Sequence, residues 1–130
     1  MEHLLPKQAW DLLQREPEAL FIDCRTDAEF FFVGHPTGAM HAALYEGPEW
    51  EPNPHFVGEV RKLSGQSPDR PVVVICRSGK RSVEAGDALE AAGFRRVYNV
   101  LHGFEGDLDE HHQRGRLNGW RFDGLPWEQT

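Results

Sequence analysis

The most informative stretch of the chain is VVVICRSGKRS, residues 72–82. It opens with four β-branched apolar residues, which is typical of a strand buried on both faces of a sheet. Cys76 follows this strand, residues 77–79 form a polar turn, and a helical spacing of small and apolar residues begins near Arg81. The stretch therefore predicts a buried strand, a short loop that begins with a cysteine, and a helix.

The loop between this strand and this helix is expected to bind an anion. The first N–H groups of a helix have no partner inside it, and the peptide dipoles add about half a positive charge there. Arg77, Lys80 and Arg81 add three cations. In such a cradle the Cys76 thiol is expected to have a pKa below the value of about 8.5 for a free thiol and to be a nucleophilic thiolate. The alternative is an inert cysteine that serves as a small apolar residue.

Residues 76–82 resemble the active-site loop of the rhodanese family of sulfurtransferases, and similar motifs follow in the family's order from about residue 5 to residue 108. A second motif has Asp23 and Arg25 at the end of a predicted strand, followed by GHPTGA at residues 34–39. An aspartate two positions from an arginine at a strand end also suggests an internal ion pair. Two separate motifs thus point to the same family.

The resemblance implies roles for these residues. Cys76 would hold the transferred sulfur as a persulfide. The loop that binds the substrate and the persulfide would consist of Arg77, Ser78, Gly79, Lys80, Arg81 and Ser82. Asp23 and Arg25 would support the site as scaffold. The turn HGFEG at residues 102–106 resembles the family's glycine-rich turn, although His102 stands where a glycine is common. No metal or organic cofactor is implied.

The remaining segments alternate between predicted helices and strands. Helices are predicted over residues 4–15, 26–32, 54–63 and 81–92, a helical turn over 107–113, and strands over 20–24, 39–43, 72–75 and 96–101. This alternation predicts an α/β fold, with a mostly parallel central sheet covered by helices on both faces, as in the three-layer rhodanese-like fold. Residues 44–53 are predicted to form a loop, in which Tyr45 or Trp50 either lines the pocket mouth or packs locally.

The length of 130 residues predicts a single domain over residues 1–130. Its core is expected at about residues 5–108. The tail, residues 109–130, contains Trp120, Phe122 and Trp127, so we expect it to pack back on the core rather than to extend into solvent.

Composition excludes several classes of function. A net charge of −7 argues against binding to nucleic acid or to an anionic membrane surface. No apolar run approaches the roughly 18 residues that a membrane-spanning helix needs. The first residues, MEHLLPK, do not have the layout of a signal peptide, so a cytoplasmic protein is expected unless a leader preceded them.

The length of the loop separates two anion-binding cysteine chemistries. Cysteine phosphatases use a Cys-x5-Arg loop that fits a phosphoryl group. Here four residues separate Cys76 from Arg81, and Ser82 occupies the position of the phosphatase arginine. A tighter loop suits one additional sulfur atom on the cysteine, which favours sulfur transfer over phosphatase activity.

We therefore expect a two-step sulfur transfer. A small anionic donor such as thiosulfate would give its sulfane sulfur to Cys76, and cyanide, a small thiol or a protein thiol would accept it. The three cations of the loop favour thiosulfate over mercaptopyruvate, because mercaptopyruvate enzymes of this family typically have small uncharged loop residues. The alternative function is a sulfur-relay or protein-interaction module without turnover in free solution.

Two further features invite chemical hypotheses. Cys24 replaces the usual aliphatic residue between the aspartate and the arginine of the second motif, so it is either a small core residue or a redox partner of Cys76. The chain has seven histidines. The adjacent His111 and His112 lack the helical spacing of a metal-binding pair, which favours a solvated surface.

Overall fold

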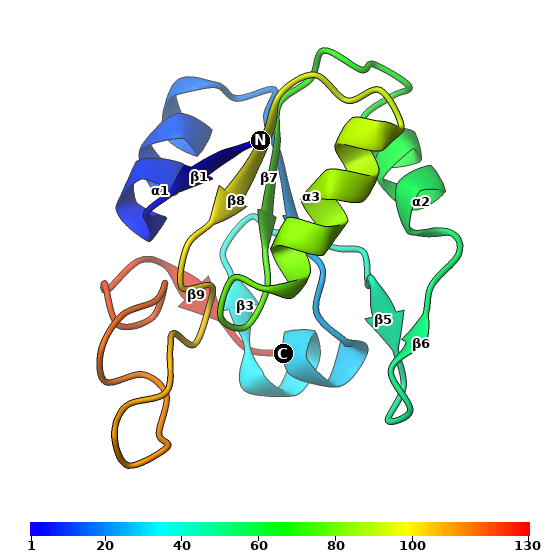
Figure 1. Cartoon of the computed structure of the whole chain (residues 1–130). Coiled ribbons are helices and arrows are strands. Elements are labelled where there is room, and N and C mark those ends of the chain that lie inside the picture. Colours follow the sequence, from blue (N-terminus) through cyan, green and yellow to red (C-terminus); the bar gives the residue numbers. More distant parts are fainter.

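A computed structural model describes all 130 residues, and its centre is a five-stranded sheet. The strand order is β1-β8-β7-β2-β4, and every neighbouring pair is parallel (Figure 1). The strands are β1 (Glu2–Leu4), β8 (Val97–Val100), β7 (Val72–Ile75), β2 (Leu20–Asp23) and β4 (Met40–His41). The predicted parallel sheet is confirmed, with β7 at its centre.

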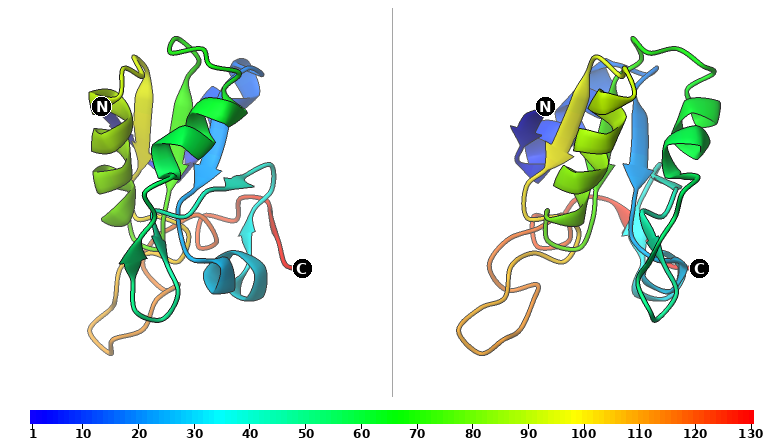
Figure 2. Two further views of the ribbon diagram at one scale, coloured as in Figure 1. Left: turned by 90° about the vertical axis from the view of Figure 1, so that its right-hand side faces the viewer. Right: turned by 45° about the vertical axis from the view of Figure 1, so that its right-hand side comes forward.

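Helices cover both faces of this sheet, as the views in Figure 2 show. Helix α1 (Pro6–Arg15) packs on one face, and helices α2 (Phe56–Leu63) and α3 (Arg81–Ala91) pack on the other. Alternate residues of β7 point to opposite faces, so Val72 and Val74 join the α2/α3 core while Val73 joins the α1 core. The α/β class and the three-layer arrangement are therefore confirmed, and no helix is long and apolar enough to cross a bilayer.

The first predicted helix is too long at its start. Residues 2–4 form the edge strand β1, in which Leu4 pairs with Val100, and α1 begins at Pro6. Proline suits the first helical position because it has no N–H to satisfy. The Gln8 side chain accepts the Leu5 N–H at 2.8 Å, which caps the helix.

The segments that follow β2 are shorter and less regular than predicted. The helix expected over 26–32 is a π-helix, η1 (Glu29–Val33), in which the Gly34 N–H reaches the Glu29 carbonyl at 3.2 Å. Thr26 and Glu29 cap the start of this segment, since each side chain accepts the other's backbone N–H. The strand expected over 39–43 is only the two residues of β4.

Residues 44–53 contain a hairpin in place of the predicted loop. The helix predicted over 54–63 is present but begins later than expected. Strands β5 (Tyr45–Glu46) and β6 (Glu51–Pro52) pair antiparallel. The Asn53 side chain donates to the Ala43 carbonyl at 2.8 Å and accepts the His55 N–H at 3.0 Å, which forms a turn over residues 53–55 ahead of the helix. Helix α2 consequently begins only at Phe56.

The tail, residues 109–130, lies beyond the carboxyl ends of β7 and β8 (Figure 1), and its residues Trp120 and Leu125 pack into the core on the α1 side. Trp120 is fully buried, and its ring packs 5.1 Å from that of Phe21 and 5.9 Å from that of Trp10, measured between centroids. The tail ends in strand β9 (Trp127–Glu128), which pairs with strand β3 (His35–Pro36). The helical turn predicted over 107–113 is reduced to one short turn, in which the His112 N–H donates to the Asp109 carbonyl at 3.0 Å and the Asp109 carboxylate accepts N–H groups two and four residues later.

Candidate active site

Cys76 lies at the carboxyl end of β7, where the chain turns into α3. The backbone N–H groups of Gly79 and Ser82 donate to its Sγ at 3.2 and 3.3 Å, and the Ser82 hydroxyl lies 3.2 Å from the same sulfur. Gly79 has a φ of +99°, a conformation that costs other residues free energy. The loop thus aims two amides at a single sulfur atom and places one hydroxyl beside it.

The turn after β8 holds this loop in place. The Phe104 N–H donates to the Cys76 carbonyl at 2.8 Å, and the Glu105 N–H donates to the Arg77 carbonyl at 2.9 Å. Gly103 has a φ of +62° and packs directly against the peptide between Cys76 and Arg77, so a side chain there would collide with the loop backbone. The glycine-rich turn is therefore a support for the cysteine loop.

The second cysteine follows the neighbouring strand and belongs to the same core cluster as the first. Cys24 follows β2, next to β7, and its N–H donates to the Ile75 carbonyl at 3.0 Å. The pKa of Cys76 is lowered to about 5, mainly by a hydrogen bond from the Cys24 thiol and further by the Ser82 and Gly79 donors. Burial opposes this shift but does not outweigh it. The same hydrogen bond, together with burial, raises the pKa of Cys24 well above its ordinary value. Both thiols are free, and the two pKa shifts favour ionisation of Cys76 over that of Cys24.

A cavity of about 650 Å³ opens beside the loop. Its lining includes Arg77, Arg114 and Trp50 together with three carboxylates, those of Asp27, Glu29 and Glu105. Cys76 itself is 1% exposed and does not line the cavity, but it directly precedes Arg77, which does. A sulfur atom added to Sγ would extend about 2 Å from it. The volume is within the range of small-molecule sites.

The three cations of the loop have different surroundings. Arg81 forms a two-pronged ion pair with Glu29, at 2.8 and 2.9 Å, and its guanidinium lies 4.5 Å from the centre of the Trp50 ring. Arg77 lines the cavity, and Lys80 is exposed at the surface. Arg77 is therefore the loop cation that faces the cavity, whereas the charge of Arg81 is balanced by Glu29.

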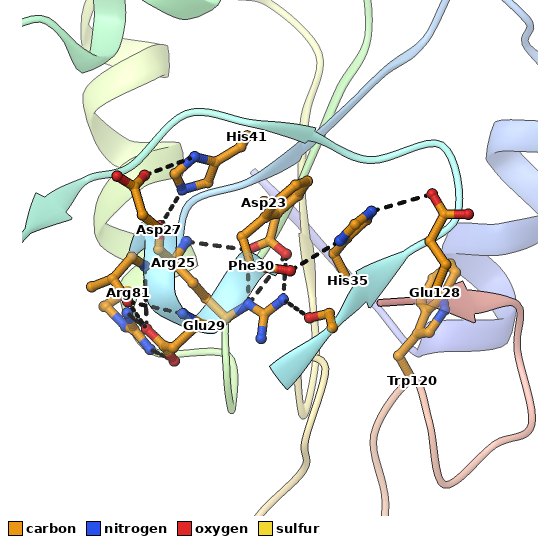
Figure 3. Close-up of polar contacts among 12 residues, drawn as sticks. Asp23, Arg25, Asp27, Glu29, Phe30, His35, His41, Arg81, Trp120 and Glu128 are labelled. Carbon is orange, nitrogen blue, oxygen red and sulfur yellow. Dashed lines mark hydrogen bonds and ion pairs between the residues drawn. The ribbon is translucent and has the colours of Figure 1, made fainter. Parts of the chain in front are cut away.

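Glu29 is in turn fixed by Arg81. Burial alone would raise the pKa of Glu29, but the hydrogen bonds and charge of Arg81 outweigh it and lower the pKa to about 2. This ion pair joins η1, which follows β2, to the first turn of α3, which follows β7 (Figure 3). Nothing in the sequence pattern indicated this bond, because Glu29 and Arg81 are 52 residues apart.

Asp23 and Arg25 form the predicted internal ion pair. Arg25 Nη2 lies 2.6 Å from Asp23 Oδ2, and both side chains are fully buried. The same nitrogen donates to the Gly34 carbonyl at 2.6 Å, and the guanidinium lies 4.6 Å from the centre of the Phe104 ring. Figure 3 shows the pair beside η1 and β3. These contacts hold the segment after β2 against the turn that supports the cysteine loop.

The remaining site residues are Ser78, which is half-buried, and Ser82, which is fully buried in the first turn of α3. Of the two aromatic candidates, Trp50 lines the cavity, whereas Tyr45 donates its hydroxyl to Glu84. No group of three or more histidine, cysteine or acidic side chains is arranged to hold a metal ion.

Comparison with known proteins now identifies the family. The model of the Rhodanese-like domain matches residues 5–110. The chain belongs to the rhodanese-like family. It is 31% identical over 125 residues to the thiosulfate sulfurtransferase GlpE of Actinobacillus succinogenes, covering 96% of this chain and 88% of that protein.

Two solved structures extend this comparison of the rhodanese-like chain. The crystal structure of Rv0390 from M. tuberculosis superposes with a TM-score of 0.87 at 37% identity, covering 100% of this chain and 98% of that one. The polysulfide-sulfur transferase homodimer from Wolinella succinogenes superposes with a TM-score of 0.65 at 27% identity, covering 100% and 80%. The family resemblance inferred from the sequence is confirmed.

Proposed function

We propose that the protein is a thiosulfate sulfurtransferase that moves one sulfane sulfur through a persulfide on Cys76. The observation behind the proposal is the polar surround of Sγ: two backbone amides donate to it and the Ser82 hydroxyl lies beside it, all within 3.3 Å. Donors placed around one atom stabilise an anion there with little reorganisation. The same donors would serve a thiolate and, after a small shift, the terminal sulfur of a persulfide.

The reaction has two displacements. The Cys76 thiolate attacks the outer sulfur of thiosulfate, a new S–S bond forms, and the original S–S bond breaks with its electron pair leaving on sulfite. An acceptor thiolate, of a small thiol or of a protein, or cyanide then attacks the terminal sulfur and regenerates the Cys76 thiolate. Arg77, which lines the cavity, would attract the anionic donor, and Lys80 would add to the positive potential from the surface.

Two other functions compete with this proposal. A sulfur-relay or interaction module would use the same persulfide but pass it only to a particular protein partner. A cysteine phosphatase would need a wider loop, and the Cys-x4-Arg spacing from Cys76 to Arg81 supports sulfur transfer instead. In addition, Arg81 is bound to Glu29 rather than free to hold a phosphoryl group.

We place the activity in the cytoplasm, with neither nucleic acid nor membrane as a partner.

A panel of three assays tests the proposal. Thiosulfate with cyanide should yield thiocyanate catalytically, thiosulfate with a small thiol should yield sulfite, and an aryl phosphate should not be hydrolysed. Stoichiometric sulfur loading without turnover with any small acceptor would favour the relay module. Rapid hydrolysis of the aryl phosphate with no sulfur transfer would contradict the proposal.

A further inference from the structure

A chain of hydrogen bonds leads from the reactive sulfur through the core to the edge of the sheet. Cys76 Sγ lies 3.2 Å from Ser82 Oγ, Ser82 Oγ donates to Asn99 Oδ1 at 2.5 Å, and Asn99 Nδ2 lies 3.1 Å from His3 Nδ1. Ser82 is fully buried and Asn99 is 1% exposed, whereas His3 is exposed. The chain of hydrogen bonds therefore connects the interior of the site with an exposed residue on the edge strand β1.

Three elements bring these side chains together. Ser82 lies in the first turn of α3, Asn99 lies on β8, and His3 lies on the edge strand β1. His3 and Asn99 are direct partners in the parallel register of β1 and β8. Asn99 occupies a buried position on β8 between Val97 and Val100, where an unpaired amide would cost free energy. Its two hydrogen-bond partners explain how the amide is accommodated there.

The chemistry of the amide couples the two ends of this chain. An asparagine side chain has an oxygen that only accepts and a nitrogen that only donates. With the oxygen toward Ser82, as observed, the serine proton is held by Asn99 and only a lone pair of Ser82 faces Sγ. This arrangement suits a Cys76 thiol, and it requires His3 Nδ1 to be an acceptor.

The opposite arrangement suits an anionic sulfur. If the Asn99 amide is reversed, its nitrogen donates to Ser82, and the serine proton is free to point at Sγ. The amide oxygen then faces His3, so His3 Nδ1 must carry a hydrogen. Each orientation of the amide thus specifies both the direction of the Ser82 proton and the donor or acceptor state of His3.

We propose that Asn99 and His3 are positioning residues that set the direction of the Ser82 hydroxyl proton and thereby the stabilisation of anionic sulfur on Cys76. The inference rests on the proposed role of Cys76 as the sulfur carrier. Its test does not use sulfur transfer, so the two can fail separately. The readout is the pKa of Cys76, taken from the pH dependence of its alkylation by iodoacetamide.

The decisive variants place at position 3 a side chain that can only donate a hydrogen bond to the Asn99 amide or one that can only accept a hydrogen bond from it. His3→Lys should hold the amide with its nitrogen toward Ser82 and lower the Cys76 pKa, and His3→Glu should do the reverse and raise it. We expect shifts of about 0.5 to 1 unit, the effect of redirecting one hydrogen bond. Glu2→Lys, on the neighbouring exposed residue, is the charge control and should leave the pKa unchanged.

The same two substitutions in an Asn99→Leu background separate the hydrogen-bond chain from direct electrostatic effects. A leucine side chain cannot pass on a donor or acceptor state, so the shifts caused by His3→Lys and His3→Glu should disappear. Shifts that persist in the Asn99→Leu background, or no shift in the native background, would overturn the proposal.

A measurement on the native protein covers the case in which Asn99→Leu does not fold. Nitrogen NMR of the His3 ring should show a protonated Nδ1 while Cys76 is a thiolate and an unprotonated, accepting Nδ1 after Cys76 is alkylated. His55, which lies outside the chain of hydrogen bonds, should not respond. Unchanged His3 resonances would contradict the coupling.

Discussion

The ends of β2 and β7 carry two cysteines that differ in chemistry although they are equally buried. Cys24 is 0% exposed and Cys76 is 1% exposed, and they lie side by side on neighbouring strands. Yet the pKa of Cys76 is lowered to about 5 while that of Cys24 is raised. Because burial disfavours the charged form of both thiols, burial cannot be the cause of the difference.

The difference lies in the donors on each sulfur: the Cys24 thiol contributes most to the lowered pKa of Cys76, and the amides that follow β7 add to it. After β7 the chain turns back, so that the N–H groups of Gly79 and Ser82 reach the sulfur of Cys76. After β2 the first free amide, that of Arg25, donates to the Asp23 carboxylate at 3.1 Å. The end of β2 therefore uses its polar groups to fix the backbone, and the end of β7 uses them to stabilise an anion.

The largest effect should come from exchanging the Cys76 thiol for a hydroxyl. Cys76→Ser should lower thiocyanate formation from thiosulfate and cyanide by about a thousandfold or more, because the nucleophile is lost. Cys24→Ser should keep most of the activity, since a serine can still donate to Cys76. Comparable losses in both variants would mean that the two cysteines act as a pair rather than as nucleophile and donor.

The next effect concerns the hydrogen bond between the two thiols. Cys24→Val fills the site but cannot donate, so the Cys76 thiolate should lose stabilisation and its pKa should rise from about 5 by about 1 to 2 units. Iodoacetamide alkylation at pH 5 to 6 should slow by about tenfold, with little change above pH 8. Cys24→Ser is the matched control, and a Cys24→Val profile that coincides with it would rule out this contribution.

The ion pair between Glu29 and Arg81 joins the two strand ends and should have a moderate effect on stability. Glu29→Gln should lower the free energy of unfolding at pH 7 by about 1–2 kcal/mol. The pKa of Glu29 is about 2 in the folded protein, below its unfolded value near 4.3, so the carboxylate stabilises the fold above pH 4.3. This stabilisation is lost as the pH falls from about 4.3 to 2.

Urea unfolding of the native chain and of Glu29→Gln at pH 7 and at pH 3 measures this dependence. The difference in unfolding free energy between the native chain and Glu29→Gln should be smaller at pH 3 than at pH 7. Asp69→Asn breaks the exposed pair of Asp69 with Arg95, whose side chains are 67% and 69% exposed, and should change stability by less than about 0.5 kcal/mol. If Glu29→Gln lowers the free energy of unfolding equally at pH 3 and pH 7, the ion pair is not the source of the loss.

The smallest effect should come from the aromatic cover of Arg81. Trp50→Leu removes the ring that lies 4.5 Å from the guanidinium but leaves the bond of Arg81 to Glu29. We expect a loss of about 0.5–1 kcal/mol in unfolding free energy. The pKa of Cys76 should remain near 5, and a rise of one unit would show that Trp50 reaches the cysteine loop.

The sequence predicts best where one local pattern determines the structure. The four apolar residues of β7 and the helical spacing after Arg81 predict the central strand and α3 nearly to the residue. The Asp23–Arg25 pair was predictable for the same reason, since its two members are two residues apart and end one strand.

The features that were missed depend on partners distant in sequence. Strand β1 exists because it pairs with β8, and β9 exists because it pairs with β3, so neither has a strong pattern of its own. The bond of Arg81 to Glu29 spans 52 residues, and the contact of Asn99 with His3 spans 96. Such contacts arise from the tertiary fold and not from local spacing.

Intact-mass spectrometry after incubation with thiosulfate tests the central claim most directly. The account predicts one additional sulfur atom per chain, removed by cyanide and located on Cys76 by peptide mapping, with none on Cys24. A sulfur atom located on Cys24, or no added sulfur while Cys76 still reacts with iodoacetamide, would contradict it.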